Sequence, residues 1–401
     1  MLENAEPKWM RYITRWIDRI GQFRAALGTS TNVFGDIVGV DIDDSSVAII
    51  QLRNPLGTIK VSRAEVAGLP TGVISEDVIV DQTVLTNTIK KLINKTKNNI
   101  KNAAIVLPGN KVAIKKIKLE SALSDDEAEV RAWQEARKTF PELAKSLFLD
   151  FVQTSEVDVS GLKKNYLILI ITKKEDIGPR VEALQQAGLI VKIADVDFYA
   201  LERAYSLFSS QLPQNHIEKY TALIDFNPHS ILFLVMHKKQ MIYSMRQVYT
   251  GDVLVPLVQQ ALGVEVTLVK PKPVLLAPFA IPMQAQTEVQ AEALLKAEAI
   301  THVLTEEQKS HMIMTIRRLF QSFYSENTGK IIDSIAMTGR CALIPDITQH
   351  IAKSLDLAVV VANPLSSLKL GEHLDGERMI KLGPAFAVSC GLAMRGIPLW
   401  K

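Results

Sequence analysis

Three short polar segments stand at the ends of apolar stretches, and their residue types suit phosphate chemistry. They are residues 41–46, 225–230 and 338–340, of which the first two are acidic and the third contains a glycine. Turns at strand ends and helix N-termini can aim backbone N–H groups at phosphate. Two acidic turns facing each other, with a glycine turn beside them, would suit a nucleotide. The spacing alone also allows a second interpretation, in which two unrelated α/β lobes carry ordinary polar hairpins.

The elements that must position these turns repeat along the chain. Apolar stretches at 36–40, 47–52 and 58–66 predict a three-stranded meander, with the first acidic turn after its first strand. Stretches at 222–225, 231–236 and 241–247 predict a second meander of the same order. The recurrence predicts two related halves, each with an acidic turn at the same point.

A separate small α/β unit is expected between the two meanders, at residues 110–190. It begins with a strand at 112–119 and a helix from Ser124, and it ends with a helix at 175–187 that Gly188 terminates. The second meander is followed by a helix from Gly251 and a proline-punctuated loop. A long helix is then expected over 286–327, with the core stripe Met312, Ile316, Leu319, Phe320 and Phe323.

The composition is that of a globular protein. The 401 residues are 47% hydrophobic and 22% charged, with a net charge of +3, which predicts more than one lobe and argues against nucleic-acid binding. Cys341 and Cys390, the only cysteines, form neither a disulfide framework nor a metal cluster. We expect Cys390 to pack in the core as a small apolar residue. The seven histidines do not show metal-ligand spacing. Because no apolar run reaches about 20 residues and charges interrupt the N-terminus, we expect a cytoplasmic protein.

Residues 8–26 predict a basic amphipathic helix, followed by a short linker. This helix would lie on an anionic membrane surface or dock a partner helix; alternatively, its apolar stripe packs on the second lobe of the chain itself. The stripe consists of Trp9, Ile13, Trp16, Ile17, Ile20 and Phe23.

Several stretches resemble known proteins, and their order is more specific than any one of them. VGVDIDDSSVAIIQL resembles the first phosphate loop of the actin-like superfamily, and of PilM proteins in particular. LPGNKVAIKKIKL and ALQQAGLIVKIADVDFYALERAY resemble the start and end of the domain inserted in PilM proteins. IAMTGRCALIPDITQHIAKSLDLAVVVANPLSSL and GPAFAVSCGLAMRGI resemble the adenosine-side segment and closing helix of that family. The resemblance runs from about Val33 to Ile397, and FtsA-like relatives fit the later segments less well.

The resemblance implies an α/β, actin-like (ribonuclease H-like) two-lobed fold with an inserted small α/β domain, in addition to the N-terminal amphipathic helix. It also divides the chain. We expect a helix and linker at 1–32, a first lobe at 33–109 completed by 191–215 and 385–401, an inserted domain at 110–190, and a second lobe at 216–384 with a mainly helical insertion near 256–329.

The resemblance implies a candidate site for ATP and Mg²⁺, with Asp41, Ser45, Ser46, Asp225 and Gly339 as cofactor-binding residues. Four positions depart from the family pattern, and Asp and Asn tolerate positive φ well enough for the turns to keep their shape. Added acidic charge and the loss of a lysine oppose the binding of a phosphate group, so we predict weak or no ATP binding. We also predict that the chain has no catalytic residues and is not an efficient enzyme. The departures are Asp43 and Asn227 for glycine, Ala48 for lysine, and Arg340 for a second glycine.

The resemblance further implies a cytoplasmic scaffold at the inner membrane, within the assembly complex of the type IV pilus. A short N-terminal peptide of PilN would bind beside the inserted domain. PilO, PilC and the pilus motor ATPases would be indirect partners, and a homo-oligomer is expected. The alternatives are an ATPase or sugar-kinase-like enzyme on the same fold and an FtsA-like membrane tether. Tethers of the FtsA kind carry their amphipathic helix at the C-terminus, whereas here it is N-terminal.

Overall fold

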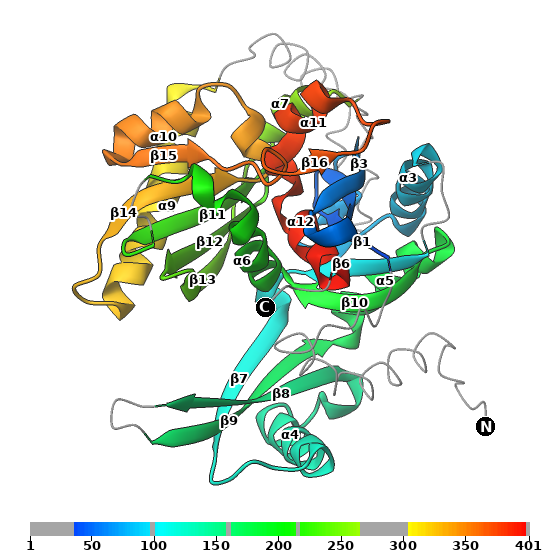
Figure 1. Ribbon diagram of the computed structural model, residues 1–401, viewed down its shortest axis with the longest axis vertical. Coiled ribbons are helices and arrows are strands. Elements are labelled where there is room, and N and C mark those ends of the chain that lie inside the picture. Colours follow the sequence, from blue (N-terminus) through cyan, green and yellow to red (C-terminus); the bar gives the residue numbers. More distant parts are fainter. Residues whose placement is uncertain (1–35, 97–100, 158–161, 214–216, 265–303, 398–401) are drawn as a thin grey trace, which may run out of the picture.

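The computed structural model describes residues 36–96, 101–157, 162–213, 217–264 and 304–397. Its strands form two large sheets, a two-stranded hairpin, and a small three-stranded sheet that extends away from the large ones at one end (Figure 1). We call the six-stranded sheet with its helices the first lobe, the five-stranded sheet with its helices the second lobe, and the three-stranded sheet the small sheet. The predicted helix at 8–26, with its stripe from Trp9 to Phe23, lies outside the described residues, as do the loop at 269–283 and the start of the helix expected from 286.

The sheet of the first lobe has the strand order β10-β6-β1-β2-β3-β16. The strands β1, β2 and β3 pair antiparallel as the predicted meander, whereas β6 joins β1 and β10 joins β6 in parallel. All six residues of β1 are buried because both faces of this central strand are covered. The bounds are β1 Ile37–Ile42, β2 Ser46–Arg53, β3 Lys60–Gly68, β6 Asn102–Leu107, β10 Ile190–Val196 and β16 Lys369–Leu370.

The sheet of the second lobe has the order β13-β12-β11-β14-β15. Its first three strands form the second predicted meander, and β14 adds to β11 in parallel. The first strand of each meander is thus flanked by a parallel strand from later in its own half, which places the two acidic turns at equivalent sheet edges. The bounds are β11 Tyr220–Asn227, β12 Ser230–His237, β13 Gln240–Val248, β14 Ile332–Thr338 and β15 Ala358–Val361.

Two helices, α6 (Asp197–Phe208) and α12 (Ala387–Ala393), lie between the two large sheets (Figure 1). The backbone of α12 packs directly on β1 at Gly39, where a Cβ would lie 2.8 Å from Ala393 N. A Cβ at Gly391 would lie 2.5 Å from the carbonyl carbon of Ala200 in α6. These close approaches hold the two helices and β1 in fixed positions relative to one another.

Three further helices, α3, α5 and α9, pack on the two large sheets. Side chains of α3 and α5 share one core cluster with the first sheet, whereas α9 buries Leu319, Phe320 and Phe323 against the second. The prediction that these three residues are core is therefore confirmed. Gly188 ends α5 with a φ of +93°, as predicted. The bounds are α3 Gln82–Lys95, α5 Lys174–Gln186, α7 Leu254–Leu262, α9 Glu306–Glu326, α10 Ile347–Leu355 and α11 Gly376–Leu382.

The small sheet has the order β7-β9-β8 and carries α4 (Asp125–Thr139) on one face (Figure 1). The strands β7 (Val112–Leu119), β8 (Leu147–Val157) and β9 (Lys163–Lys173) pair antiparallel. Ser124 caps α4 in a capping box with Glu127, which explains why the helix begins where the sequence predicted it.

Neither cysteine is placed for chemistry. Cys341 and Cys390 are both free and buried, and burial raises the pKa of each thiol above its ordinary value. Cys390 packs in the core, as predicted. Among the described helices, none is both long and apolar enough to span a bilayer.

Candidate functional site

The structure brings the three predicted turns together at the junction of the lobes. Asp41 stands near the end of β1, and Asp225 stands near the end of β11, where it is paired with Thr338 of β14. Gly339 and Arg340 follow Thr338 directly, so the third turn lies beside the second. Hydrogen bonds from Arg340 then reach the first turn across the cleft.

Gly339 is required by both its backbone and its surroundings. Its φ is +89°, and a Cβ there would lie 2.6 Å from Phe226 N and closer still to Phe226 O. Its own N–H donates to Pro384 O at 3.0 Å. This tight turn aims the side chain of the next residue, Arg340, at the first lobe.

Arg340 is the centre of the site, and its side chain fills the space between the two acidic turns. Its Nη1 donates to Asp41 Oδ2 at 2.6 Å and its Nε donates to Ser46 Oγ at 3.0 Å, both in the first lobe. Its backbone N–H donates to Asn227 Oδ1 at 3.0 Å in the second lobe. Only 1% of the residue is exposed. Within the described residues its Nη2 has no acceptor.

The charges around Arg340 fix its protonation. Burial alone would lower the pKa of Arg340, but the carboxylates of Asp41, Asp43 and Asp225 outweigh burial and hold the pKa above its ordinary value. The sequence showed Arg340 only as a departure from a glycine. One sequence signal could have indicated its role: two acidic turns need a cation, and the third turn carries an arginine.

Asp225 has both carboxylate oxygens engaged within the second lobe. Oδ1 accepts a hydrogen bond from Thr338 Oγ1 and Oδ2 accepts one from Asn227 Nδ2, each at 2.7 Å. Burial raises the pKa of Asp225 to about 6, against the opposing charge of Arg340. Asp225 is thus a buried structural carboxyl in this structure, with no oxygen turned to open space.

The first turn is closed by its own side chains. Asp43 Oδ1 accepts hydrogen bonds from Ser45 N at 2.8 Å and from the Ser45 hydroxyl, and Asp43 N donates to Ser46 O at 3.0 Å. The expected use of positive φ is wrong, because neither Asp43 nor Asn227 adopts it. Each instead keeps its turn by hydrogen bonding through its side chain.

A second layer of polar and charged side chains surrounds this centre. His229 lies between Asp44 Oδ2, 3.4 Å from its Nδ1, and Asp252 Oδ1, 2.7 Å from its Nε2. Arg246 of β13 binds Asp197 Oδ2 and Asp77 Oδ1, each at 2.9 Å. These residues were missed in the sequence because their partners are separated from them by tens to more than a hundred residues.

As they stand, the residues of the site do not fit a magnesium nucleotide. The guanidinium of Arg340 occupies the space between the turns, the Ser45 hydroxyl is turned to Asp43, and Ser46 Oγ accepts from Arg340. Carboxylates also outnumber the cations that face them, which opposes a polyphosphate. In the described part of the chain, no group of three or more His, Cys, Asp or Glu side chains could hold a metal ion. The assignment of Asp41, Ser45, Ser46, Asp225 and Gly339 to a nucleotide site, and the weak or absent ATP binding expected there, stay predictions.

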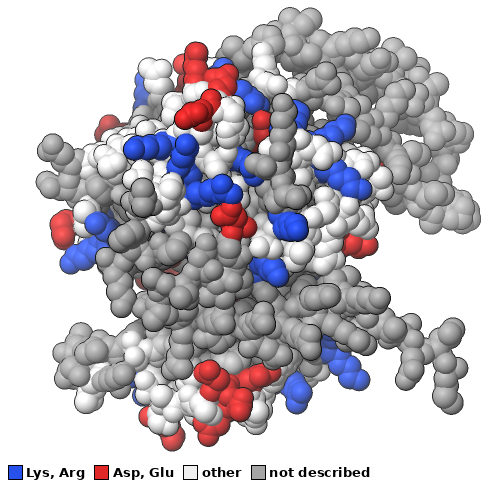
Figure 2. Space-filling view, turned by 45° about the vertical axis from the view of Figure 1, so that its right-hand side comes forward, with Lys and Arg blue, Asp and Glu red and all other residues white. Residues whose placement is uncertain are grey.

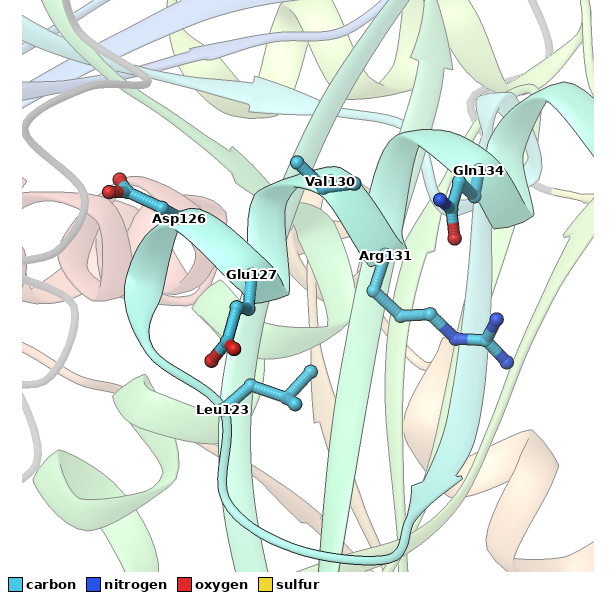
Figure 3. A pocket seen from close by; sticks show the side chains of 6 residues that line it. All are labelled: Leu123, Asp126, Glu127, Val130, Arg131 and Gln134. Carbon is cyan, nitrogen blue, oxygen red and sulfur yellow. The ribbon is translucent and has the colours of Figure 1, made fainter.

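A hollow on α4 is a second feature of the surface (Figure 3). Val130, 58% exposed, lies on its wall. Figure 2 shows basic and acidic side chains interspersed over the described part of one face, with acidic ones gathered at the end formed by the small sheet and α4. The mixed lining of the hollow favours no single class of ligand. It consists of Leu123, Asp126, Glu127, Val130, Arg131 and Gln134.

Comparison with known proteins decides the family. The model of a family described as type IV pilus assembly protein PilM matches residues 39–268 and 281–397. The chain belongs to the PilM family. The match begins within β1 and takes in the later strands through β16 and the closing helix α12, so it covers both lobes and the small sheet of this PilM-family chain.

Several solved structures resemble this chain in fold. A PilM–PilN type IV pilus biogenesis complex is similar with a TM-score of 0.64 and 16% identity, covering 91% of this chain and 99% of that chain. The ethanolamine utilization protein EutJ from Carboxydothermus hydrogenoformans has a TM-score of 0.45 and 10% identity, covering 95% of this chain and 98% of that chain. A diol dehydratase-reactivating factor in nucleotide-free form has a TM-score of 0.45 and 11% identity, covering 90% of this chain and 99% of that chain. The predicted actin-like α/β fold of the PilM family is confirmed.

Proposed function

We propose that this chain is a cytoplasmic, non-catalytic scaffold at the inner-membrane complex of the type IV pilus. Membership of the PilM family supports the role in pilus assembly. The site supports the absence of catalysis, because its carboxylates and hydroxyls are bonded to other protein groups rather than turned toward a substrate. Homo-oligomers, PilO, PilC and the motor ATPases belong to this proposal as further partners.

We propose that the direct partner is the short N-terminal peptide of PilN, held between the first lobe and the small sheet. The similar structure is a complex of PilM with PilN. The observation that favours this place is the face of the small sheet opposite α4, which carries apolar side chains that belong to none of the hydrophobic clusters formed by the described residues. They are Ile114, Val152, Ile168 and Ile170, each intermediate or exposed.

These side chains form one continuous stripe across all three strands. Ile114 pairs with Ile170, which pairs in turn with Asp150, and Ile168 pairs with Val152. Directly paired residues on one face lie about 5 Å apart, so the stripe suits a peptide with alternating apolar residues. The adjacent Asp150, whose pKa burial raises to about 6, would favour a basic group on the peptide.

Capture of purified PilN from the same organism tests this proposal. Ile168→Asp places a charge in the stripe and should reduce capture at least tenfold. Ile331→Asp, at a side chain that is 70% exposed on the second lobe, is the matched control and should capture normally. Undiminished capture by Ile168→Asp would place the PilN site elsewhere. If the unaltered chain captures no PilN, the partner itself is wrong.

A further inference from the structure

The cleft between the lobes is filled by the protein's own cation, and this conflicts with what the fold family implies for that place. The guanidinium of Arg340 reaches Asp41 and Ser46 on one side of the cleft, while its backbone N–H is held by Asn227 on the other. Nη1 also lies 3.5 Å from Asn227 Oδ1. One residue therefore contacts both turns that a nucleotide would have to separate.

The burial of these groups shows that the contact is built in rather than incidental. The side chain of Arg340 is 2% exposed, and those of Asp41 and Asp43 are 7% and 9% exposed. A carboxylate and a guanidinium buried to this extent are stable only when paired, because each loses its hydration. Gly339, fixed by its φ and by Phe226, leaves the Arg340 backbone little freedom to swing the side chain out.

We propose that Arg340 closes the cleft in place of a metal–nucleotide. Its guanidinium supplies the positive charge that Asp41 and Asp43 need and joins the two lobes, so that the closed arrangement requires no ligand and MgATP is excluded. The cleft becomes accessible to Mg²⁺ or MgATP only when this side chain is removed. The inference goes beyond the pilus role and does not depend on PilN.

Thermal unfolding of the full chain, with and without MgATP, tests the proposal. We expect 1 mM MgATP to shift the Tm of the unaltered chain by less than about 1 °C, since only a ligand that binds the folded state raises Tm. Arg340→Ala should lower Tm by roughly 5–10 °C, because it leaves buried carboxylates unpaired. Addition of Mg²⁺ or MgATP should then raise the Tm of this variant in a concentration-dependent manner.

Gln259→Ala is the matched control, because it also removes a buried contact between the lobes but takes away neither a charge nor a hydrogen bond of Arg340. Its Nε2 donates to Leu69 O at 2.9 Å. The control should lose stability without gaining a response to MgATP. Hydrogen exchange should rise at residues 41–46 and 225–230 in Arg340→Ala but not in the control.

Three results would overturn the proposal. One is a clear MgATP shift in the unaltered chain. Another is a folded Arg340→Ala variant that responds to neither Mg²⁺ nor MgATP. The third concerns Arg340→Lys, which keeps the charge without the planar fork and serves if the alanine variant does not fold. We expect Arg340→Lys to be less stable than the unaltered chain. Equal stability would show that the guanidinium of Arg340 does not stabilise the contact between the lobes. These results test Arg340 alone. A negative result here would not contradict the PilN proposal, and loss of PilN capture would not contradict the role of Arg340.

Discussion

Arg246 and Asp77 form an ion pair of 2.9 Å that joins the outer strand of the second lobe to a two-residue turn of the first. Asp77 adopts a φ of +65° in the turn between β4 (Ile74–Ser75) and β5 (Val78–Ile79), which directs its carboxylate to the cleft. Asp197, at the start of α6, holds the other nitrogen of the same guanidinium. Arg246 is thus a second buried cation, besides Arg340, that joins the two lobes.

Removal of this cation should destabilise the protein strongly. Arg246→Met leaves Asp77 and Asp197 buried without their partner, and we expect the free energy of unfolding to fall by about 3–5 kcal/mol in urea denaturation. Adding Asp77→Asn should recover part of the loss, since Asn tolerates positive φ and carries no charge. Lys309→Ala, which removes an ion pair with the exposed Glu306, is the control and should cost far less than Arg246→Met, because water screens the exposed pair. Equal losses in the two variants would contradict the role of Arg246.

Stability should fall as the pH rises toward neutrality, in part because of Asp44. Burial, with help from Asp43 and Asp77 and against His229 and Arg246, raises the pKa of Asp44 from 3.8 to about 7. The folded protein therefore holds a proton that the unfolded chain releases near pH 4, and the contribution of this carboxyl to stability declines between about pH 4 and pH 7.

The variant Asp44→Asn removes this titration. Its stability relative to the unaltered chain should improve as the pH rises from 5 to 7, by at most about 1.4 kcal/mol per pH unit, because only the folded unaltered chain still holds the Asp44 proton there. Urea denaturation at several pH values measures the difference. Asp252→Asn alters the exposed partner of the same His229 and should not reproduce the trend. A constant difference between Asp44→Asn and the unaltered chain would show that Asp44 does not titrate in this range.

Gly339 should tolerate no side chain. Gly339→Ala forces a Cβ against the backbone of Phe226, and we expect a loss of about 3–5 kcal/mol in the free energy of unfolding. Gly188→Ala is the matched control, because its φ of +93° is similar but nothing lies within 4 Å of the added carbon. It should cost only about 1–2 kcal/mol. If both variants lose the same free energy of unfolding, the contact with Phe226 does not contribute to the cost of Gly339→Ala.

The basic segment at 8–26 should bind anionic vesicles in flotation experiments. Each of its basic residues near such a surface contributes about 1 kcal/mol, which added salt would weaken. Trp16→Glu combined with Ile20→Glu should abolish flotation, whereas Ser30→Glu combined with Asn32→Glu adds the same charge outside the apolar stripe and should not. If the unaltered chain ignores anionic vesicles and the first variant merely loses stability, the segment packs on the protein instead.

Local patterns predicted the elements of this fold well. The strand at 112–119 and the start of α4 after Ser124 have the predicted bounds, because alternation and capping depend on neighbours in sequence. The meanders were recognisable for the same reason. The recurrence indicated two halves, but their actin-like arrangement rested on resemblance, since parallel pairs such as β1 with β6 join residues more than sixty positions apart.

The site was only partly predictable. The positions of Asp41, Asp225 and Gly339 could be assigned from strand ends and turn residues, and the structure does bring them together. The partners of their side chains could not, because Arg340 meets Asp41 at a separation of 299 residues. Nor would Ala48→Lys simply restore a phosphate-binding cation, since Ala48 is fully buried and a lysine there would bury an unpaired charge.

The small sheet leaves the main body and returns to it at almost the same point. Val112 and Thr172 are paired, and Thr172 Oγ1 donates to Lys111 O at 2.9 Å. An insert whose two ends meet can be lengthened, shortened or exchanged for another without changing the distance that the host chain must span. Residues 112–173 could therefore be exchanged between related chains without moving the rest of the fold, and such a graft would have to match this pair of residues and the packing of Phe148 on the first lobe.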